Sequence, residues 1–171
     1  IDLSTTYTFE RSSAVAESMD ALIEGAGEAP NPVYARLRNP TVAGFENALA
    51  DLESAEAAVA FASGMAAITA MVLAAGSEAA PDGWARGRHI VAIRPIYGGT
   101  DHLLATGILG TEVTWAEPDE VAESLRADTC LVLLETPANP TLAMVDIAGV
   151  VSQVRATEKR FGYRIAVAVD N

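Results

Sequence analysis

The sequence predicts an α/β protein whose mostly parallel β-sheet is covered by helices on both faces. Short apolar segments alternate with amphipathic segments along most of the 171 residues. The apolar segments lack polar alternation, and uniformly apolar strands are typical of a sheet buried on both sides. With 50% hydrophobic, 20% charged and 6% aromatic residues, the chain has the composition of one globular domain or most of one.

The first forty residues break this pattern. Residues 1–31 are rich in Ser, Thr, Gly and Glu and show no sustained period outside a helical stretch at residues 14–23. We expect residues 1–40 to form an arm or extended segment that packs on something else.

A helix is expected to begin at Pro40. Asn39 can cap this helix, and proline is tolerated in the first turn because its missing N–H has no helical partner there. The apolar positions of the helix fall on one face, at Phe45, Ala48, Leu49 and Leu52.

Strands and helices then alternate along the chain. The expected strands are residues 57–62, 89–93, 112–115, 131–134 and 165–169. The expected helices are residues 64–75, 100–109, 119–127 and 147–161. The last helix is the best marked, because a polar cluster lies opposite an apolar stripe formed by Ile147, Val150, Val151, Val154 and Phe161. Catalytic groups should gather where the parallel strands end, at the carboxyl edge of the sheet.

Charge and cysteine usage disfavour several partners and compartments. The 11 basic and 23 acidic residues give a net charge of -12, which repels nucleic-acid phosphates and anionic lipid surfaces. The single cysteine, Cys130, opens an apolar run and predicts a buried thiol in a reducing compartment. No basic, apolar leader precedes Ile1, and the Ala-rich stretches are too short to cross a bilayer. We therefore expect a cytoplasmic protein. Because Ile1 is not Met and Asn171 closes a predicted strand, we also expect the sequence to be a fragment at both ends.

Ser63-Gly64-Met65 lies where a predicted strand gives way to a helix. The free N–H groups of a first helical turn and the positive end of the helix dipole can hold a phosphate. A Ser-Gly pair in this place is also a common cap and tight turn without any ligand.

Two loops carry further candidates. Tyr97 precedes Gly98-Gly99, and this loop would free its ring to lie flat on a heterocycle. Asn139 follows the strand at 131–134, where its amide could donate to a phenolic oxygen. The alternatives are a tyrosine packed on the surface and an Asn-Pro turn.

Asp170 ends the last predicted strand. A carboxylate against a pyridine nitrogen keeps that nitrogen protonated and makes the ring an electron sink, although an aspartate at a strand end is also a frequent turn former. An aldehyde cofactor would also need an amine, yet the only lysine is Lys159, in the polar cluster of the last helix. No metal-binding residues are predicted, and neither G-x-G-x-x-G nor G-x-x-x-x-G-K-[ST] is present to support a nucleotide-binding domain.

Five motifs together resemble the Cys/Met-metabolism family of pyridoxal-phosphate enzymes, which includes methionine and cystathionine γ-lyases, cystathionine γ-synthases, cystathionine β-lyases and O-acylhomoserine sulfhydrylases. They span nearly the whole chain in the family's order: residues 34–41 (YARLRNPT), 61–67 (FASGMAA), 97–100 (YGGT), 135–140 (ETPANP) and 169–171 (VDN). The resemblance implies the fold type I aminotransferase scaffold. It also implies that residues 1–40 contact a neighbouring subunit and that residues 41–171 form the first part of the large, cofactor-binding domain.

The resemblance also implies roles for individual residues. Ser63, Gly64 and Met65 would hold the phosphate of pyridoxal 5'-phosphate, Asn139 would bond the ring hydroxyl oxygen, and Asp170 would pair with the ring nitrogen. Tyr97 would stack on the ring and transfer protons near the leaving group, so that Tyr97 and Asp170 are the catalytic candidates. Tyr34 and Arg36 would reach the phosphate of a neighbouring subunit, which makes a dimer obligatory and a tetramer expected. The cofactor lysine and the substrate-binding arginine would lie beyond Asn171.

The resemblance favours a γ-lyase that acts on methionine or cystathionine. Many methionine γ-lyases carry cysteine two places after the loop tyrosine, whereas this chain has Gly99, which leaves strict methionine specificity open. A γ-replacement enzyme, either a cystathionine γ-synthase or an O-acylhomoserine sulfhydrylase, would share every residue seen here. A silent oligomerisation or binding module that lost the amine is the alternative from another class.

Overall fold

The computed structural model describes residues 1–24, 31–77 and 80–171, which form two compact units, Ile1–Phe61 and Ala62–Asn171. Within the described ranges, no helix has the length and apolar character needed to span a membrane. The same ranges contain no group of three or more His, Cys, Asp and Glu side chains arranged to hold a metal ion.

The unit Ile1–Phe61 contains helix α1 (Ser12–Ile23) and helix α2 (Pro40–Glu53). The predicted cap is confirmed, because the Asn39 side chain accepts hydrogen bonds from the backbone N–H groups of Thr41 at 2.9 Å and Val42 at 3.2 Å. The apolar face of α2 does not belong to the core of this unit. Ala43 is the buried residue of α2, whereas the residues of the predicted apolar face are exposed: Phe45, Ala48, Leu49 and Leu52.

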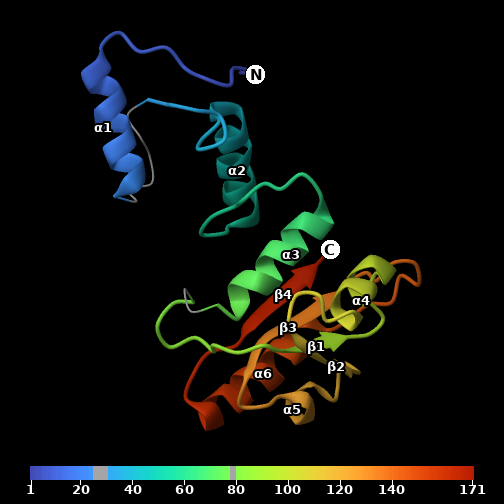
Figure 1. Ribbon diagram of the computed structural model, residues 1–171. Coiled ribbons are helices and arrows are strands. Elements are labelled where there is room, and N and C mark those ends of the chain that lie inside the picture. Colours follow the sequence, from blue (N-terminus) through green and yellow to red (C-terminus); the bar gives the residue numbers. More distant parts are fainter. Residues whose placement is uncertain (25–30, 78–79) are drawn as a thin grey trace. The chain divides into compact units, whose positions relative to one another are not determined.

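The unit Ala62–Asn171 is built on the predicted parallel sheet (Figure 1). Its strands are β1 (His89–Ile93), β2 (Glu112–Ala116), β3 (Thr129–Glu135) and β4 (Ala166–Asp170). They pair in the order β2-β1-β3-β4, and every pairing is parallel. The two central strands, β1 and β3, are buried along their whole length, which explains their uniformly apolar sequences.

The predicted strand at residues 57–62 is wrong. This segment has no strand structure and is almost entirely exposed. Its apolar character comes mostly from alanine, which is depleted in strands because its small side chain gains little from packing on a pleated surface.

In the described part of this unit, the sheet is covered by helices α3 (Gly64–Ala75), α4 (Gly98–Ala105), α5 (Val121–Ser124) and α6 (Ile147–Phe161). Helix α3 contacts α4, and α5 contacts α6; Figure 1 shows α3 and α6 on opposite sides of the sheet. Helix α6 has the predicted bounds, but its buried residues are Val150, Val154 and Thr157, and Ile147 is exposed. Helix α5 is shorter than expected, because the chain already turns at Leu125, in extended conformation, toward β3.

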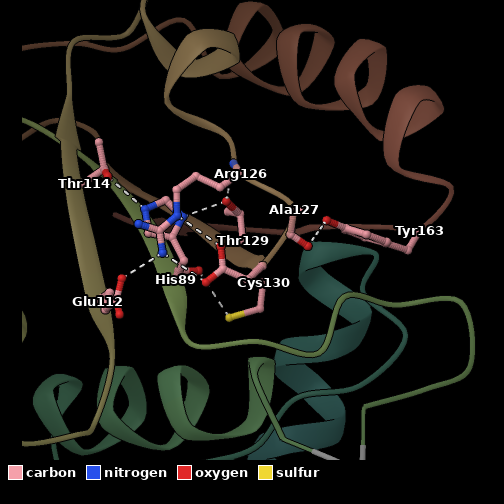
Figure 2. A network of polar contacts seen from close by, with 9 residues as sticks. His89, Glu112, Thr114, Arg126, Ala127, Thr129, Cys130 and Tyr163 are labelled. Atoms are coloured by element: carbon pink, nitrogen blue, oxygen red, sulfur yellow. Dashed lines mark hydrogen bonds and ion pairs between the residues drawn. The ribbon is translucent and has the colours of Figure 1, made fainter.

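A polar cluster lies where β1, β2 and β3 begin (Figure 2). The fully buried His89 places Nδ1 2.7 Å from Thr129 Oγ1 and Nε2 2.8 Å from Thr114 Oγ1. The buried thiol of Cys130 donates to the His89 carbonyl oxygen at 3.5 Å, which agrees with the predicted buried cysteine. Both ring nitrogens of His89 are therefore satisfied inside the fold.

Charge and burial act together on His89. Burial lowers the pKa of its imidazole, and the positive charge of Arg126 lowers it further. Arg126 itself is held outside the core by Glu112 at 2.8 Å and Asp128 at 3.0 Å. The neutral imidazole is the form that the folded chain favours.

This preference predicts acid sensitivity. Because the pKa of His89 is lower in the folded than in the unfolded chain, its contribution to stability is present above the unfolded value of about 6.5 and is lost as pH falls below it. We expect the difference in melting temperature between the wild type and His89→Gln to shrink between pH 7.5 and pH 5. The exposed His102 provides the control, since His102→Gln should leave the pH dependence of the wild type unchanged. A constant difference for His89→Gln would contradict this account.

Candidate active site

Three of the predicted site residues lie at or just after the carboxyl ends of adjacent parallel strands. Tyr97 lies in the loop after β1, Asn139 lies in the loop after β3, and Asp170 is the last residue of β4. These three strands are neighbours in the order β1-β3-β4, so their carboxyl ends meet at one edge of the sheet. The structure therefore brings these residues to the edge where the sequence predicted a site.

A buried carboxylate joins two of these loops. Glu135, the last residue of β3, is only 6% exposed. Its Oε2 accepts a short hydrogen bond from the backbone N–H of Tyr97, and its Oε1 accepts one from the N–H of Asn139 at 2.7 Å. Glu135 opens the motif at residues 135–140, but no role for its side chain was predicted. The signal that could have revealed it is a single acid at the end of an otherwise apolar strand.

Asp170 lies beside this carboxylate. It is the direct cross-strand partner of Glu135 in the β3–β4 pairing, and its carbonyl oxygen accepts the N–H of Thr136 at 3.0 Å. Partial burial raises the pKa of the Asp170 carboxyl group, and the negative charge of Glu135 raises it further. A cation placed against Asp170 would oppose both effects by stabilising the ionised carboxylate. The arrangement is therefore suited to a protonated ring nitrogen.

The first turn of α3 offers donors for an anion. Ser63 caps the helix, since its Oγ accepts the N–H of Ala66 at 3.2 Å, and the first intrahelical bond joins Ala67 N–H to Ser63 O at 3.1 Å. The amides of Gly64 and Met65 precede that bond and have no helical partner. No atom lies within 4 Å of a Cβ built on Gly64, so space is open beside these donors. Geometry and dipole both suit a phosphate here.

Gly99 lies between Tyr97 and the first turn of α3. A Cβ added to Gly99 would lie 2.5 Å from Cε1 of the Tyr97 ring and 3.3 Å from Sδ of Met65. The hydroxyl group of Thr100 also lies 3.8 Å from Met65 Sδ. The half-exposed Tyr97 ring therefore lies close to the first turn of α3, which carries the phosphate-type donors.

Tyr34 and Arg36 belong to the unit Ile1–Phe61. The Arg36 guanidinium carbon lies 4.9 Å from the centroid of the Tyr34 ring, a cation–π contact. Arg36 also lines a cavity of about 340 Å³ together with Arg38, Asn39 and Glu46. Their expected contact with the phosphate of a neighbouring subunit stays a prediction.

Comparison with known proteins decides the family. All residues from 1 to 171 match the family described as Cys/Met metabolism PLP-dependent enzyme. The chain belongs to this family.

Named relatives of the Cys/Met metabolism family agree with this assignment. An L-methionine gamma-lyase of Streptomyces avermitilis is 55% identical over 148 residues, which cover 86% of this chain and 34% of that protein. An O-succinylhomoserine sulfhydrylase of Pseudomonas aeruginosa is 38% identical over 134 residues, which cover 75% of this chain and 31% of that protein. The chain thus spans about a third of the length of the curated relatives it matches.

A solved structure confirms the fold. A protein described as an O-acetylhomoserine (thiol)-lyase of Campylobacter jejuni, crystallised with a pyridoxyl-lysine monophosphate group, superposes with a TM-score of 0.76 at 25% identity. The match covers 98% of this chain and 38% of that chain. The predicted fold type I scaffold of pyridoxal-phosphate enzymes is thereby confirmed for the part of the fold that this chain contains.

The crowding at Gly99 yields a prediction. In Gly99→Ala the new methyl group cannot remain 2.5 Å from the Tyr97 ring, so we expect the ring to turn away from its present position. The matched control is Gly98→Ala, because no atom lies within 4 Å of a Cβ at Gly98. Crystal structures of both variants measure the ring position. An unmoved ring in Gly99→Ala would show that the helix, rather than Tyr97, gives way.

Proposed function

We propose that this chain forms the first part of the cofactor domain of a pyridoxal-phosphate-dependent carbon–sulfur lyase, which eliminates the γ-substituent of methionine or cystathionine. The observation that carries the proposal is the meeting of Tyr97, Asn139 and Asp170 at one edge of the sheet in a chain of this family. The 55% identity to an L-methionine gamma-lyase supports the choice of reaction within the family.

The residues at this edge fit the cofactor. The amides of Gly64 and Met65 would hold the phosphate, with Ser63 fixing the turn that presents them. Asn139 would donate its side-chain amide to the ring hydroxyl oxygen, and Asp170 would accept the ring N–H. When bound, pyridoxal 5'-phosphate supplies an electron sink for the substrate carbanion.

The protein side chains then have distinct tasks. Asp170 would keep the proton on the ring nitrogen, because its carboxylate would stabilise the positive charge of the protonated ring. The side chain of Tyr97 is half-exposed and would lie against the cofactor ring, from where its hydroxyl group could exchange a proton with a departing sulfur. Two protons leave the substrate, from Cα and Cβ, and the γ-substituent departs with its bonding electrons.

The amine that tethers the cofactor is proposed to lie outside residues 1–171. Lys159, the only lysine here, is exposed in the last turn of α6. Helix α6 leads into the beginning of β4, so Lys159 lies toward the amino edge of the sheet and away from Asp170. A catalytic role for Lys159 is therefore not proposed.

We also propose a homo-oligomer in which Tyr34 and Arg36 complete the phosphate site of a neighbouring subunit. Residues 1–40 would form the arm that makes this contact, and residues 41–171 would begin the large domain. A dimer suffices for a complete site, and a tetramer is the expected assembly. The buried thiol of Cys130 supports a reducing, cytoplasmic setting.

The cofactor assignment predicts a visible signal. We expect the full-length protein to bind pyridoxal 5'-phosphate and to absorb visible light near neutral pH. Asp170→Ala should weaken cofactor binding or turnover by an amount equivalent to about 2–5 kcal/mol, because the ring cation loses its partner. Asp82→Ala, at a fully exposed carboxylate, is the control. A colourless wild-type protein would refute the assignment and favour the silent binding module.

The reaction assignment predicts particular products. With methionine or cystathionine alone, we expect release of a thiol, ammonia and a 2-oxo acid. The specific rival is γ-replacement, which the similarity to an O-succinylhomoserine sulfhydrylase favours. Incubation with O-succinyl- or O-acetylhomoserine plus cysteine or sulfide separates the two reactions. Rapid formation of a thioether or a thiol amino acid, with slow elimination from methionine, would overturn the lyase assignment.

A further inference from the structure

We propose that Glu135 is a positioning residue of this site, whose buried carboxylate holds the Tyr97 loop and the Asn139 loop in one fixed arrangement. The inference rests on the proposed function, since it concerns the same cofactor site. Glu135 would touch neither cofactor nor substrate and would act through the residues that do.

The hydrogen bonds of Glu135 connect the two loops. Each oxygen of the Glu135 carboxylate serves one loop, Oε2 accepting from Tyr97 N–H and Oε1 from Asn139 N–H. Tyr97 is 38 residues away in sequence and Asn139 only 4, so a single side chain links two separate connections. Hydrogen bonds to an ionised acceptor are roughly twice as strong as neutral ones.

Only a carboxylate can accept hydrogen bonds from both of these backbone amides. A glutamine of the same shape has one acceptor oxygen and would present its NH₂ group to the second amide, leaving two donors face to face. An unpaired donor in a buried position costs about 1–3 kcal/mol. Helix α4 begins directly after Tyr97, and its first two residues, Gly98 and Gly99, have no side chains that could fix the Tyr97 loop. Glu135 supplies the anchor that the glycines lack.

Glu135 also lies next to Asp170. The two residues are paired across β3 and β4, so the negative charge of Glu135 lies close to the group that is proposed to hold the ring nitrogen. Two neighbouring negative charges favour a cation more strongly than one does. Loss of the Glu135 charge should therefore weaken the hold on the ring in addition to loosening the loops.

Hydrogen exchange in the cofactor-free, full-length protein tests the anchor without any reaction. In Glu135→Gln we expect the amide of Tyr97 or of Asn139 to exchange at least about tenfold faster than in the wild type. The matched control is Glu112→Gln, at an exposed carboxylate that begins β2 on the opposite edge of the sheet. Unchanged protection of both amides in Glu135→Gln would overturn the proposal.

Cofactor binding provides the second readout. We expect Glu135→Gln to bind pyridoxal 5'-phosphate about ten- to a hundredfold more weakly than the wild type, and Glu135→Asp to recover part of the loss because it keeps both oxygens and the charge. Faster exchange with unchanged cofactor affinity would mean that Glu135 fixes the loops without serving the site, and would also overturn the proposal. Should Glu135→Gln fail to fold, the same two measurements on Glu135→Asp decide, and wild-type values in both would overturn it.

The outcomes separate this inference from the proposed function. If the wild type binds no cofactor, the proposed function fails, whatever the exchange measurements show for the loops. If the wild type binds the cofactor and Glu135→Gln matches it in both affinity and amide protection, the positioning role fails and the proposed function stands.

Discussion

Parallel pairing of the strands is the constraint on which the rest of this structure depends. Every strand runs in the same direction, so the chain must cross the sheet after each one, and the loops that follow the strands all emerge at one edge. Tyr97, Asn139 and Asp170 are far apart in sequence, and the parallel strands bring them to this common edge. Their proximity costs little additional free energy, because burial of β1 and β3 already fixes the strands that carry them.

Polar side chains are satisfied differently at the amino and the carboxyl edge of the sheet. At the amino edge, His89 is fully buried, and Thr114 and Thr129 satisfy both of its ring nitrogens, which avoids the cost of a buried polar group without a partner. At the carboxyl edge, Glu135 is satisfied by backbone donors, but Asp170 carries a raised pKa and a like charge beside it. Polar groups at the amino edge form hydrogen bonds with one another, whereas the carboxylates at the carboxyl edge favour the binding of an external cation.

Pattern in the sequence was sufficient for the order of strands and helices in Ala62–Asn171, but it did not give the bounds of α4 and α5 or the side-chain contacts. The bounds of β1, α3 and α6 follow from apolar runs and caps, which are local signals. The strand expected at 57–62 fails because alanine counts as apolar without favouring a pleated surface. The roles of Glu135 and His89 depend on which strands are neighbours and in what register, and spacing along one chain does not contain that information. The place of Asp170 was predictable, but the carboxylate opposite it was not.

The charge arrangement at the carboxyl edge also explains how a chain with a net charge of -12 can hold an anionic cofactor. The donors at the start of α3 are backbone amides, whose partial positive charges are fixed by the helix and act at short range, so this part of the proposed phosphate site contains no basic side chain. Acceptors lie instead at the ends of β3 and β4, where Glu135 and Asp170 are paired. A ligand with an anionic group at one end and a protonated nitrogen at the other is therefore favoured in a single orientation. In that orientation its flat face could pack on the Tyr97 ring, because Gly99 lies between this ring and Met65 in the first turn of α3. Reversing such a ligand would place its phosphate against two carboxylates, so the charges that are proposed to bind the ligand would also select its orientation.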